Sequence, residues 1–270
     1  MSFVAIISPA KKMNVVDAAL PVRSEPRFLE RTRELMEAVQ ALDYAEAQAL
    51  WKCSDKLAQQ NFDRFAQMDL ARASTPAVIA YEGIQYQHLA PRVMDERCLD
   101  YLDRHLRILS GFYGVLRPFD AVLPYRLEMQ ARLSVGGARD LYAYWGSSLA
   151  EALADDLAPA EPVAAGAAHD AAARRVVLNL ASVEYARAVT PHAAAAGLTV
   201  LTCLFGQERE GKFVQRSTEA KAARGAFVRW LAERGVEDLA ELPAFAERGY
   251  RWDRARSDER VLCFVRGAAV

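Results

Sequence analysis

The sequence has few cysteines and histidines, and their spacing does not suit a metal ion. Its 270 residues include four cysteines (Cys53, Cys98, Cys203 and Cys263) and four histidines. The cysteines are far apart and never form CxxC, which indicates free thiols in a reducing compartment. No histidine has a carboxylate or a second histidine at ligand spacing, and HExxH and ExxH are missing. We therefore expect no metal site and no resident cofactor.

Long hydrophobic runs and an excess of one charge are also missing. No apolar run approaches the ~20 residues of a membrane helix. The N-terminus MSFVAIISPAKK places its lysines after a short apolar run, the reverse of a signal peptide. We therefore expect a cytoplasmic protein without a membrane partner. We also expect it to be a monomer. The formal net charge of −1 excludes a chain-wide basic field for nucleic acid, so any anion site must be a local patch.

The remaining composition is that of an ordinary globular α/β protein. Hydrophobic residues make up 52% of the chain and charged residues 26%. Because there is no internal repeat and no long linker, residues 1–270 are expected to form a single compact domain. The Ala/Pro-rich segment 156–173 has no apolar period and is predicted to be a surface insertion.

Apolar periodicity predicts the main elements of this domain. Strands are expected at 3–7, 76–81, 105–109 and 175–180, and hairpins at 198–216 and 251–265. Helices are expected at 27–42, from an Asp43–Glu46 capping box through Trp51, after Ser54, from Asp140 to Leu153, at 181–189 before Pro191, and from Ser217 or Thr218 to Gly235.

Polar loops follow the four early strands at once. They are Ser8–Lys12, Glu82–Gly83, Ser110–Gly114 and Asn179–Ser182. In open α/β sheets, ligands bind outside the carboxyl ends of the strands, so these loops would converge on one site if the strands are parallel.

The first loop, Ser8-Pro9-Ala10-Lys11-Lys12, has two interpretations. Ser8 followed by Pro9 is typical of the start of a helix. Lysines in a first helical turn oppose the helix dipole, however, and an anionic ligand there would remove the conflict.

Residues 104–132 are the most basic segment. Five arginines oppose Asp120 and Glu128, which leaves a net charge of +3, and Tyr113 and Tyr125 are interleaved. Arginines with aromatic residues suit phosphate contact and base stacking. LSGFYGVLRP resembles the hairpin of a helix-hairpin-helix element, although its glycines are one residue too far apart, and a plain glycine turn with solvated arginines is the alternative. The five arginines are Arg104, Arg107, Arg117, Arg126 and Arg132.

Three further groups have both structural and functional interpretations. Arg126 and Glu128 would lie on one face of an extended segment. There they would form a structural ion pair, or Glu128 would be a catalytic carboxylate. Asn179 and Ser182 could cap the next helix, with Glu184 in its first turn. Lys221 and Arg224 share a helix face in a second basic patch, and mid-helix Gly225 indicates close approach of another backbone or a ligand.

Taken in order, these segments resemble the YaaA family of peroxide-stress proteins. The matching pieces are ISPAK, SDKLA, HLRILSGFYGVLRPFD, PYRLEM, LYAYWG, NLASVEY and KAARG. The resemblance implies a cytoplasmic protein of the response to hydrogen peroxide that limits unincorporated iron and oxidative DNA damage. It also implies a mixed α/β fold, with a central mixed sheet flanked by helices, a positively charged cleft, a helix-hairpin-helix-like element and binding to duplex or branched DNA.

The resemblance also points to the residues that would bind nucleic acid or another anion. They are Ser8, Lys11, Lys56, Arg107, Ser110, Tyr113, Arg117, Tyr125, Arg126, Asn179, Ser182, Tyr185, Lys221 and Arg224.

Two functions fit this residue set. A DNA-binding protective protein would use arginines on phosphates and Tyr113 near the backbone or a base. An enzyme acting on a nucleotide or nucleic-acid base would use a general acid or base, with Lys11 or Lys56 stabilising an anion. A narrow cavity with a buried carboxylate favours the enzyme, and an open basic groove favours the binder. The catalytic candidates are Glu128, Glu184, Tyr113 and Lys56.

Overall fold

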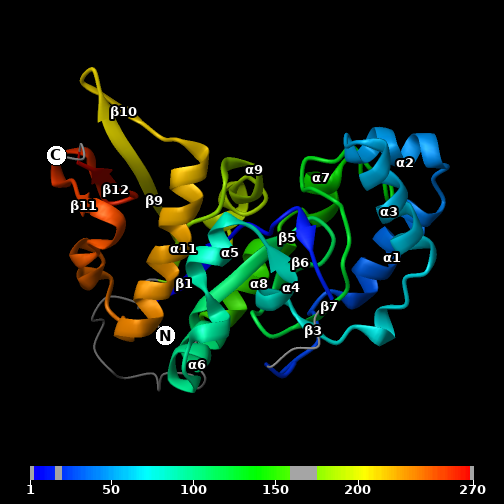
Figure 1. Cartoon of the computed structure of the whole chain (residues 1–270), viewed down its shortest axis with the longest axis horizontal. Coiled ribbons are helices and arrows are strands. Elements are labelled where there is room, and N and C mark those ends of the chain that lie inside the picture. The colour runs from blue at the N-terminus through cyan, green and yellow to red at the C-terminus, as the bar shows by residue number, and fades with distance from the viewer. Residues whose placement is uncertain (1–2, 16–19, 159–174, 268–270) are drawn as a thin grey trace.

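A mixed sheet forms the centre of the molecule (Figure 1). The computed structural model describes residues 3–15, 20–158 and 175–267, and within these eight strands share the sheet. Five of them are parallel neighbours, in the order β12 (Val261–Arg266), β9 (Leu198–Arg209), β8 (Arg175–Asn179), β1 (Phe3–Ile7) and β5 (Leu106–Ser110). Antiparallel strands extend it: β11 (Tyr250–Trp252) on β12, β10 (Lys212–Val214) on β9 and β6 (Gly114–Leu116) on β5.

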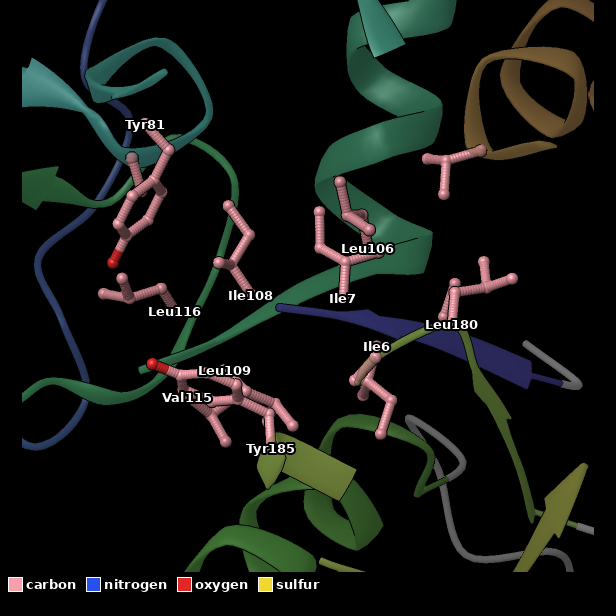
Figure 2. Packing of buried hydrophobic residues seen from close by; sticks show 14 of the residues in the cluster. Ile6, Ile7, Tyr81, Leu106, Ile108, Leu109, Val115, Leu116, Leu180 and Tyr185 are labelled. Carbon is pink, nitrogen blue, oxygen red and sulfur yellow. The ribbon is translucent and has the colours of Figure 1, made fainter. Parts of the chain in front are cut away.

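The inner strands are apolar at consecutive positions because both faces of the sheet are covered. Figure 2 shows Ile7 and Ile108 on one face, and Ile6 and Leu109 on the other. All four are fully buried, so the continuous apolar runs are those of buried parallel strands. The predicted strands at 3–7, 105–109 and 175–180 and both predicted hairpins are confirmed, within a residue or two at most ends.

The predicted strand at 76–81 is wrong. That segment is a buried helical turn, α4 (Ala77–Ala80), between the short strands β3 (Thr75–Pro76) and β4 (Tyr81–Glu82). All four residues of α4 are buried, and a short segment buried on every side is continuously apolar whichever structure it adopts. β3 pairs with β7 (Ala121–Val122), and β4 with β2 (Lys12–Met13), outside the central sheet.

Three helices at one end of the molecule follow their predicted boundaries closely. They are α1 (Leu29–Gln40), α2 (Tyr44–Trp51) and α3 (Asp55–Ala66), which gather at the opposite end from β11 and β12 (Figure 1). The Asp43–Glu46 capping box of α2 is present in both directions. Ser54 precedes α3 but makes no capping hydrogen bond.

The other predicted helices are partly corrected. The single helix expected from Asp140 is two, α7 (Leu141–Trp145) and α8 (Ser148–Asp156), because Gly146 leaves the helical conformation with a φ of 52°. Pro191 does not end a helix but lies in the first turn of α10 (Thr190–Ala193). The preceding helix, α9 (Val183–Ala186), has already ended before α10 begins. The last helix, α11 (Ser217–Arg234), ends at Gly235 as predicted. Of the predicted insertion 156–173, residues 159–173 lie outside the described residues.

Besides α4 and α10, two helices and several short turns of the described residues were not predicted. They are α5 (Ile84–Leu89) and α6 (Glu96–His105), with the 3-10 turns η1 (Leu70–Arg72), η2 (Pro91–Val93), η3 (Leu239–Ala244), η4 (Glu247–Gly249) and η5 (Arg254–Arg256).

The LSGFYGVLRP segment is a hairpin between two strands. β5 and β6 pair from Ile108–Leu116 to Ser110–Gly114, and Phe112 and Tyr113 in the turn are fully buried. A helix-hairpin-helix-like element is therefore not confirmed in this segment. The mixed α/β fold with a central mixed sheet and flanking helices is confirmed.

Candidate functional site

A cavity of about 560 Å³ opens where β1 and β8 end. Because β1, β5 and β8 are parallel neighbours, their following loops lie at one edge of the sheet, as expected. The Glu82–Gly83 loop arrives by another route, through the pairing of β4 with β2. Ten of the predicted site residues line the cavity: Ser8, Lys11, Tyr125, Arg126, Glu128, Ser182, Glu184, Tyr185, Lys221 and Arg224.

Hydrogen bonds fasten the loops after β1 and β8 to each other. The Ser182 amide donates to Ser8 Oγ at 2.8 Å, and the two hydroxyl oxygens are 3.2 Å apart. The Tyr86 hydroxyl donates to the Ser8 carbonyl oxygen at 3.0 Å. Residues 8–11 are not helical, so Ser8 does not cap a helix. The loop instead presents Lys11 and Lys12 at the mouth of the cavity, where both side chains are exposed.

One carboxylate in the cavity is held by two cations. Glu128 Oε1 lies 3.1 Å from a terminal nitrogen of Arg126 and 3.2 Å from Lys11 Nζ. The predicted pairing of Arg126 with Glu128 is therefore confirmed. The side chains of Arg126 and Glu128 are 10% and 12% exposed, so their attraction is weakly screened by solvent. Both side chains are held at defined positions in the cavity wall.

A second carboxylate, Glu184, has a different environment. It comes from the first turn of α9, is half-buried, and accepts a hydrogen bond from the Gln130 amide at 3.3 Å. Burial raises the pKa of Glu184 above its ordinary value, and the nearby charge of Glu128 adds to the rise, whereas Lys11 opposes it. A carboxyl group with a raised pKa beside a second carboxyl group is suited to proton transfer.

The opposite wall has donors without partners. Arg224 on α11 is half-buried, and among the described residues it forms no ion pair; its Nε is buried without a hydrogen-bond partner. Burial lowers its pKa. Gln85 on α5 is 6% exposed, and its Nε2 also lacks a hydrogen-bond partner in the described part of the chain. Buried donors of this kind call for an acceptor from a ligand or solvent.

Close packing of α5 against α11 brings these two donors to the same cavity. A Cβ atom at Gly225 would overlap the carbonyl oxygen of Gln85, so only glycine allows the helices to approach this far. The sequence indicated such an approach at Gly225, and the partner is the backbone of α5. Figure 1 shows the two helices side by side.

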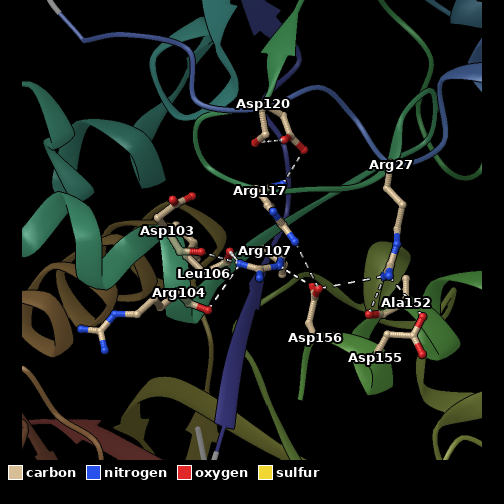
Figure 3. A network of polar contacts seen from close by, with 11 residues as sticks. Arg27, Asp103, Arg104, Leu106, Arg107, Arg117, Asp120, Ala152, Asp155 and Asp156 are labelled. Atoms are coloured by element: carbon tan, nitrogen blue, oxygen red, sulfur yellow. Dashed lines mark hydrogen bonds and ion pairs between the residues drawn. The ribbon is translucent and has the colours of Figure 1, made fainter. Parts of the chain in front are cut away.

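Two of the predicted arginines belong to a different cluster (Figure 3). Arg107 is 4% exposed, and its Nε donates to Asp156 Oδ2 at 2.6 Å. Arg117 and Arg27 approach the other oxygen of Asp156 at 3.9 Å and 4.0 Å. The structure thus places Arg107 and Arg117 in an ion-pair network and not at the cavity.

Four other predicted residues also lie away from the cavity wall. Ser110 and Tyr113 are fully buried, and the Tyr113 hydroxyl accepts a hydrogen bond from the Leu123 amide. Asn179 is 5% exposed and uses its Oδ1 to accept from the Ala181 amide. Lys56 lies exposed on α3. As placed, none of the four can contact a ligand in the cavity.

The cavity also contains residues outside the predicted set of ligand contacts. Lys12 and Glu82 belong to two of the polar loops that the sequence placed at the site, but neither was predicted as a contact. Lys12 and Glu82 face each other across β2 and β4 with an ion-pair distance of 2.8 Å. Gln85 and Tyr86 come from α5, which the sequence showed only as a polar loop after an apolar run. Ser217 begins α11. The YEGIQYQHL segment was the available signal, but its helical turn was not predicted.

The lining charges leave the cavity positive. Five basic side chains and three carboxylates line it, a net charge of +2 when all are ionised. In the described part of the chain, no group of three or more His, Cys, Asp or Glu side chains is arranged to hold a metal ion. Within the same residues, no helix has the length and apolarity needed to cross a membrane.

Comparisons with known proteins match the chain over nearly its whole length. The family described as peroxide stress protein YaaA matches residues 3–256. A UPF0246 protein of Lactiplantibacillus plantarum is 44% identical over 96% of this chain and 98% of its own length. UPF0246 proteins of Limosilactobacillus fermentum and Desulfitobacterium hafniense are 45% and 39% identical, over 97% and 98% of this chain and 98% of each relative. The chain therefore belongs to the peroxide stress protein YaaA family.

Proposed function

We propose that the chain serves its family's peroxide-stress role by binding an anionic, nucleotide-sized ligand in the strand-end cavity and acting on it chemically. The observation that carries this proposal is the half-buried Arg224, which has no carboxylate partner among the described residues and faces the cavity with Lys221. A guanidinium in such a place is stabilised by an oxyanion, and carboxylate and phosphate are the groups that arginine binds with paired hydrogen bonds.

The size and residue composition of the cavity favour a small ligand over a duplex. Ligand pockets commonly measure 300–1,000 Å³, and the cavity of about 560 Å³ lies within that range. Carboxylates beside cations are not required for holding a backbone phosphate, whereas a carboxylate can transfer protons in acid–base chemistry. Glu184, whose pKa is raised by burial, is the proposed general acid or base. The ligand would be positioned by Glu128 together with its ion-pair partners Lys11 and Arg126.

The test is a binding measurement with a matched variant pair. Titration calorimetry with inorganic phosphate and with purine and pyrimidine mononucleotides should detect binding by the unaltered protein. Arg224→Gln should weaken it about tenfold or more, since a hydrogen bond to a charged group contributes ~1.5–3 kcal/mol. Arg229→Gln is the control, because Arg229 is on the same helix but pairs with Glu233 at 2.7 Å. Equal affinity in both variants would refute the proposal.

Binding to duplex or branched DNA is a second proposed function. It is favoured by the three exposed lysines at the cavity mouth, Lys11, Lys12 and Lys221, which could contact phosphates on either side of one nucleotide. Fluorescence anisotropy with a labelled duplex, a four-way junction and a single strand would compare these ligands. If Lys221→Ala weakens DNA binding and mononucleotide binding alike, the cavity takes one nucleotide of the strand. If it weakens neither, the DNA proposal fails.

We also propose that limitation of free iron and of oxidative DNA damage follows indirectly from the activity at this cavity. The described residues do not form a cluster suited to iron, so storage by this part of the chain is not expected. Purified protein incubated with ferrous iron and desalted should retain less than one iron per chain. Stoichiometric retention would contradict an indirect role.

A further inference from the structure

A chain of three buried hydroxyl groups leads from the end of β5 to the cavity. Ser110 Oγ lies 2.6 Å from the hydroxyl oxygen of Tyr125, which lies 2.8 Å from that of Tyr81. The three residues are 0%, 4% and 3% exposed. Tyr125 also lines the cavity, and Ser110 and Tyr81 do not. The chain therefore connects to the cavity through Tyr125.

The direction of the first hydrogen bond follows from the backbone behind it. The amides of Phe112 and Tyr113 both donate to Ser110 Oγ, at 3.1 Å and 2.8 Å. With its oxygen accepting two hydrogen bonds, Ser110 has its own proton left to donate. Within the part of the chain that the structure describes, the hydroxyl at 2.6 Å is that of Tyr125, and Ser110 also interacts with the Tyr81 hydroxyl. Tyr125 thus receives a hydrogen bond from a hydroxyl that two peptide groups have already polarised.

Counting the protons leaves one without an acceptor in the described protein. The three hydroxyls supply three protons, and the two oxygen–oxygen contacts use two of them. The third belongs to Tyr81 or to Tyr125, depending on which of them donates to the other. If Tyr81 donates, Tyr125 accepts two hydrogen bonds and its own O–H is free to point into the cavity. A buried donor left unpaired destabilises the protein, and a ligand oxygen at that position would satisfy it.

We propose that Tyr125 donates a hydrogen bond to an oxygen of the bound ligand, and that Ser110 and Tyr81 are positioning residues that orient and polarise its hydroxyl. The proposal deepens the function proposed for the cavity and rests on it, because it concerns an oxygen of the same anionic ligand. In this proposal the buried Ser110 does not contact the ligand; it acts on the ligand by orienting the Tyr125 hydroxyl.

Burial and the neighbouring hydroxyl groups shift the pKa values of Tyr125 and Tyr81. Burial raises the pKa of Tyr125 to about 12, while the hydrogen bonds from Ser110 and Tyr81 hold it down. Burial raises the pKa of Tyr81 well above its ordinary value; the bond with Tyr125 adds to the rise, and Ser110 opposes it. At 2.8 Å the geometry allows either hydroxyl of this pair to donate, and the proposed donor is Tyr81. The other titratable groups that interact electrostatically with Tyr125 are Glu128, Tyr86, Tyr113 and Tyr185.

The test follows the Tyr125 hydroxyl directly, by fluorine NMR. The full-length protein is produced with fluorotyrosine at its ten tyrosines, and the Tyr125 resonance is assigned by its loss in Tyr125→Phe. In a pH titration, Ser110→Ala should raise the pKa of the fluorotyrosine at 125 by about one unit, since a hydrogen bond to the ionised form is lost. Tyr81→Phe removes the other donor without altering the backbone turn, and it should shift the same pKa upward even if Ser110→Ala does not fold.

A ligand titration separates this inference from the proposed function. Inorganic phosphate should move the Tyr125 resonance and leave that of Tyr101 unmoved, because the Tyr101 hydroxyl is buried and donates to the Val236 carbonyl at 2.6 Å. Arg224→Gln should shift the phosphate response to about tenfold higher phosphate concentration or beyond, but leave the pKa of Tyr125 unchanged. Phosphate binding without a change at Tyr125, or folded Ser110→Ala and Tyr81→Phe proteins with an unchanged pKa at Tyr125, would overturn the inference. Absence of phosphate binding by calorimetry would overturn the proposed function and the donor role with it.

Discussion

At the scale of single residues, two carboxylates pair with most of the basic side chains that the sequence predicted as ligand contacts. Glu128 holds Arg126 and Lys11 in the cavity, and Asp156 holds Arg107 at 2.6 Å with two more arginines at about 4 Å. The arginine beside Glu128 and the arginines beside Asp156 have different roles. Arg126 can still meet a ligand in the cavity, whereas Arg107 is committed to the fold.

Removal of the Asp156 charge should destabilise the fold strongly. Asp156→Asn leaves the nearly buried guanidinium of Arg107 without its counter-ion, and breaking a buried pair in this way costs ~3–5 kcal/mol. Asp155→Asn is the matched control: its partner Arg27 is 44% exposed, so the loss should be ~0–1 kcal/mol. Urea unfolding of both variants measures the difference in the free energy of unfolding. A similar loss for both would mean that the Asp156 network does not stabilise Arg107.

The sequence could predict residue types at the site more readily than their placement. Arg126 and Glu128 are two residues apart in an extended segment, so their pairing is a local property that the sequence contains. The partner of Arg107 lies 49 residues further along the chain. Nothing local distinguishes an arginine that meets a ligand from one that meets Asp156, and both Arg107 and Arg117 were therefore predicted as ligand contacts.

At the scale of elements, the site depends on how closely α11 approaches α5. Gly225 is the point of contact, and one turn of helix connects it to Lys221. The sequence predicted α11, its end at Gly235 and the close approach at Gly225, because these depend on helical period and on glycine. It failed for residues 76–81, because α4 is buried all round and its apolar run has no periodicity.

Gly225→Ala should destabilise the protein and weaken ligand binding together. Alanine normally favours a helix over glycine by ~1 kcal/mol. Here its Cβ would overlap the Gln85 carbonyl oxygen, and such overpacking costs ~1–3 kcal/mol and forces α5 and α11 apart. Thr218→Ala, at an exposed position of the same helix, provides the control and should be neutral or slightly stabilising. Thermal unfolding and phosphate titration of both variants test this; a Gly225→Ala protein of raised stability would show that the helices can separate freely.

At the scale of the whole molecule, strand order decides that the site exists. β1 lies between β5 and β8 with all three parallel, so loops from residues 8–12, 110–114 and 179–182 reach one edge. The sequence predicted the strands and the polar loops, but their order depends on pairings between segments more than 60 residues apart in the chain. Convergence of the loops could therefore be stated from the sequence only on the condition that the strands are parallel.

The charge of the whole molecule sets how strongly salt should affect any DNA binding. With a net charge of −1, long-range attraction to DNA is absent and only local cations contribute. Three exposed lysines at the cavity mouth, Lys11, Lys12 and Lys221, would displace about three counterions, so log K should fall with log salt at a slope of about −2 to −3. Lys221→Ala should reduce the slope by about one, and Lys56→Ala, on the distant α3, should leave it unchanged. Anisotropy titrations of a labelled duplex between 50 and 300 mM salt measure both slopes. A slope steeper than about −6 would require a second basic surface, and the cavity mouth would then not be the main DNA contact.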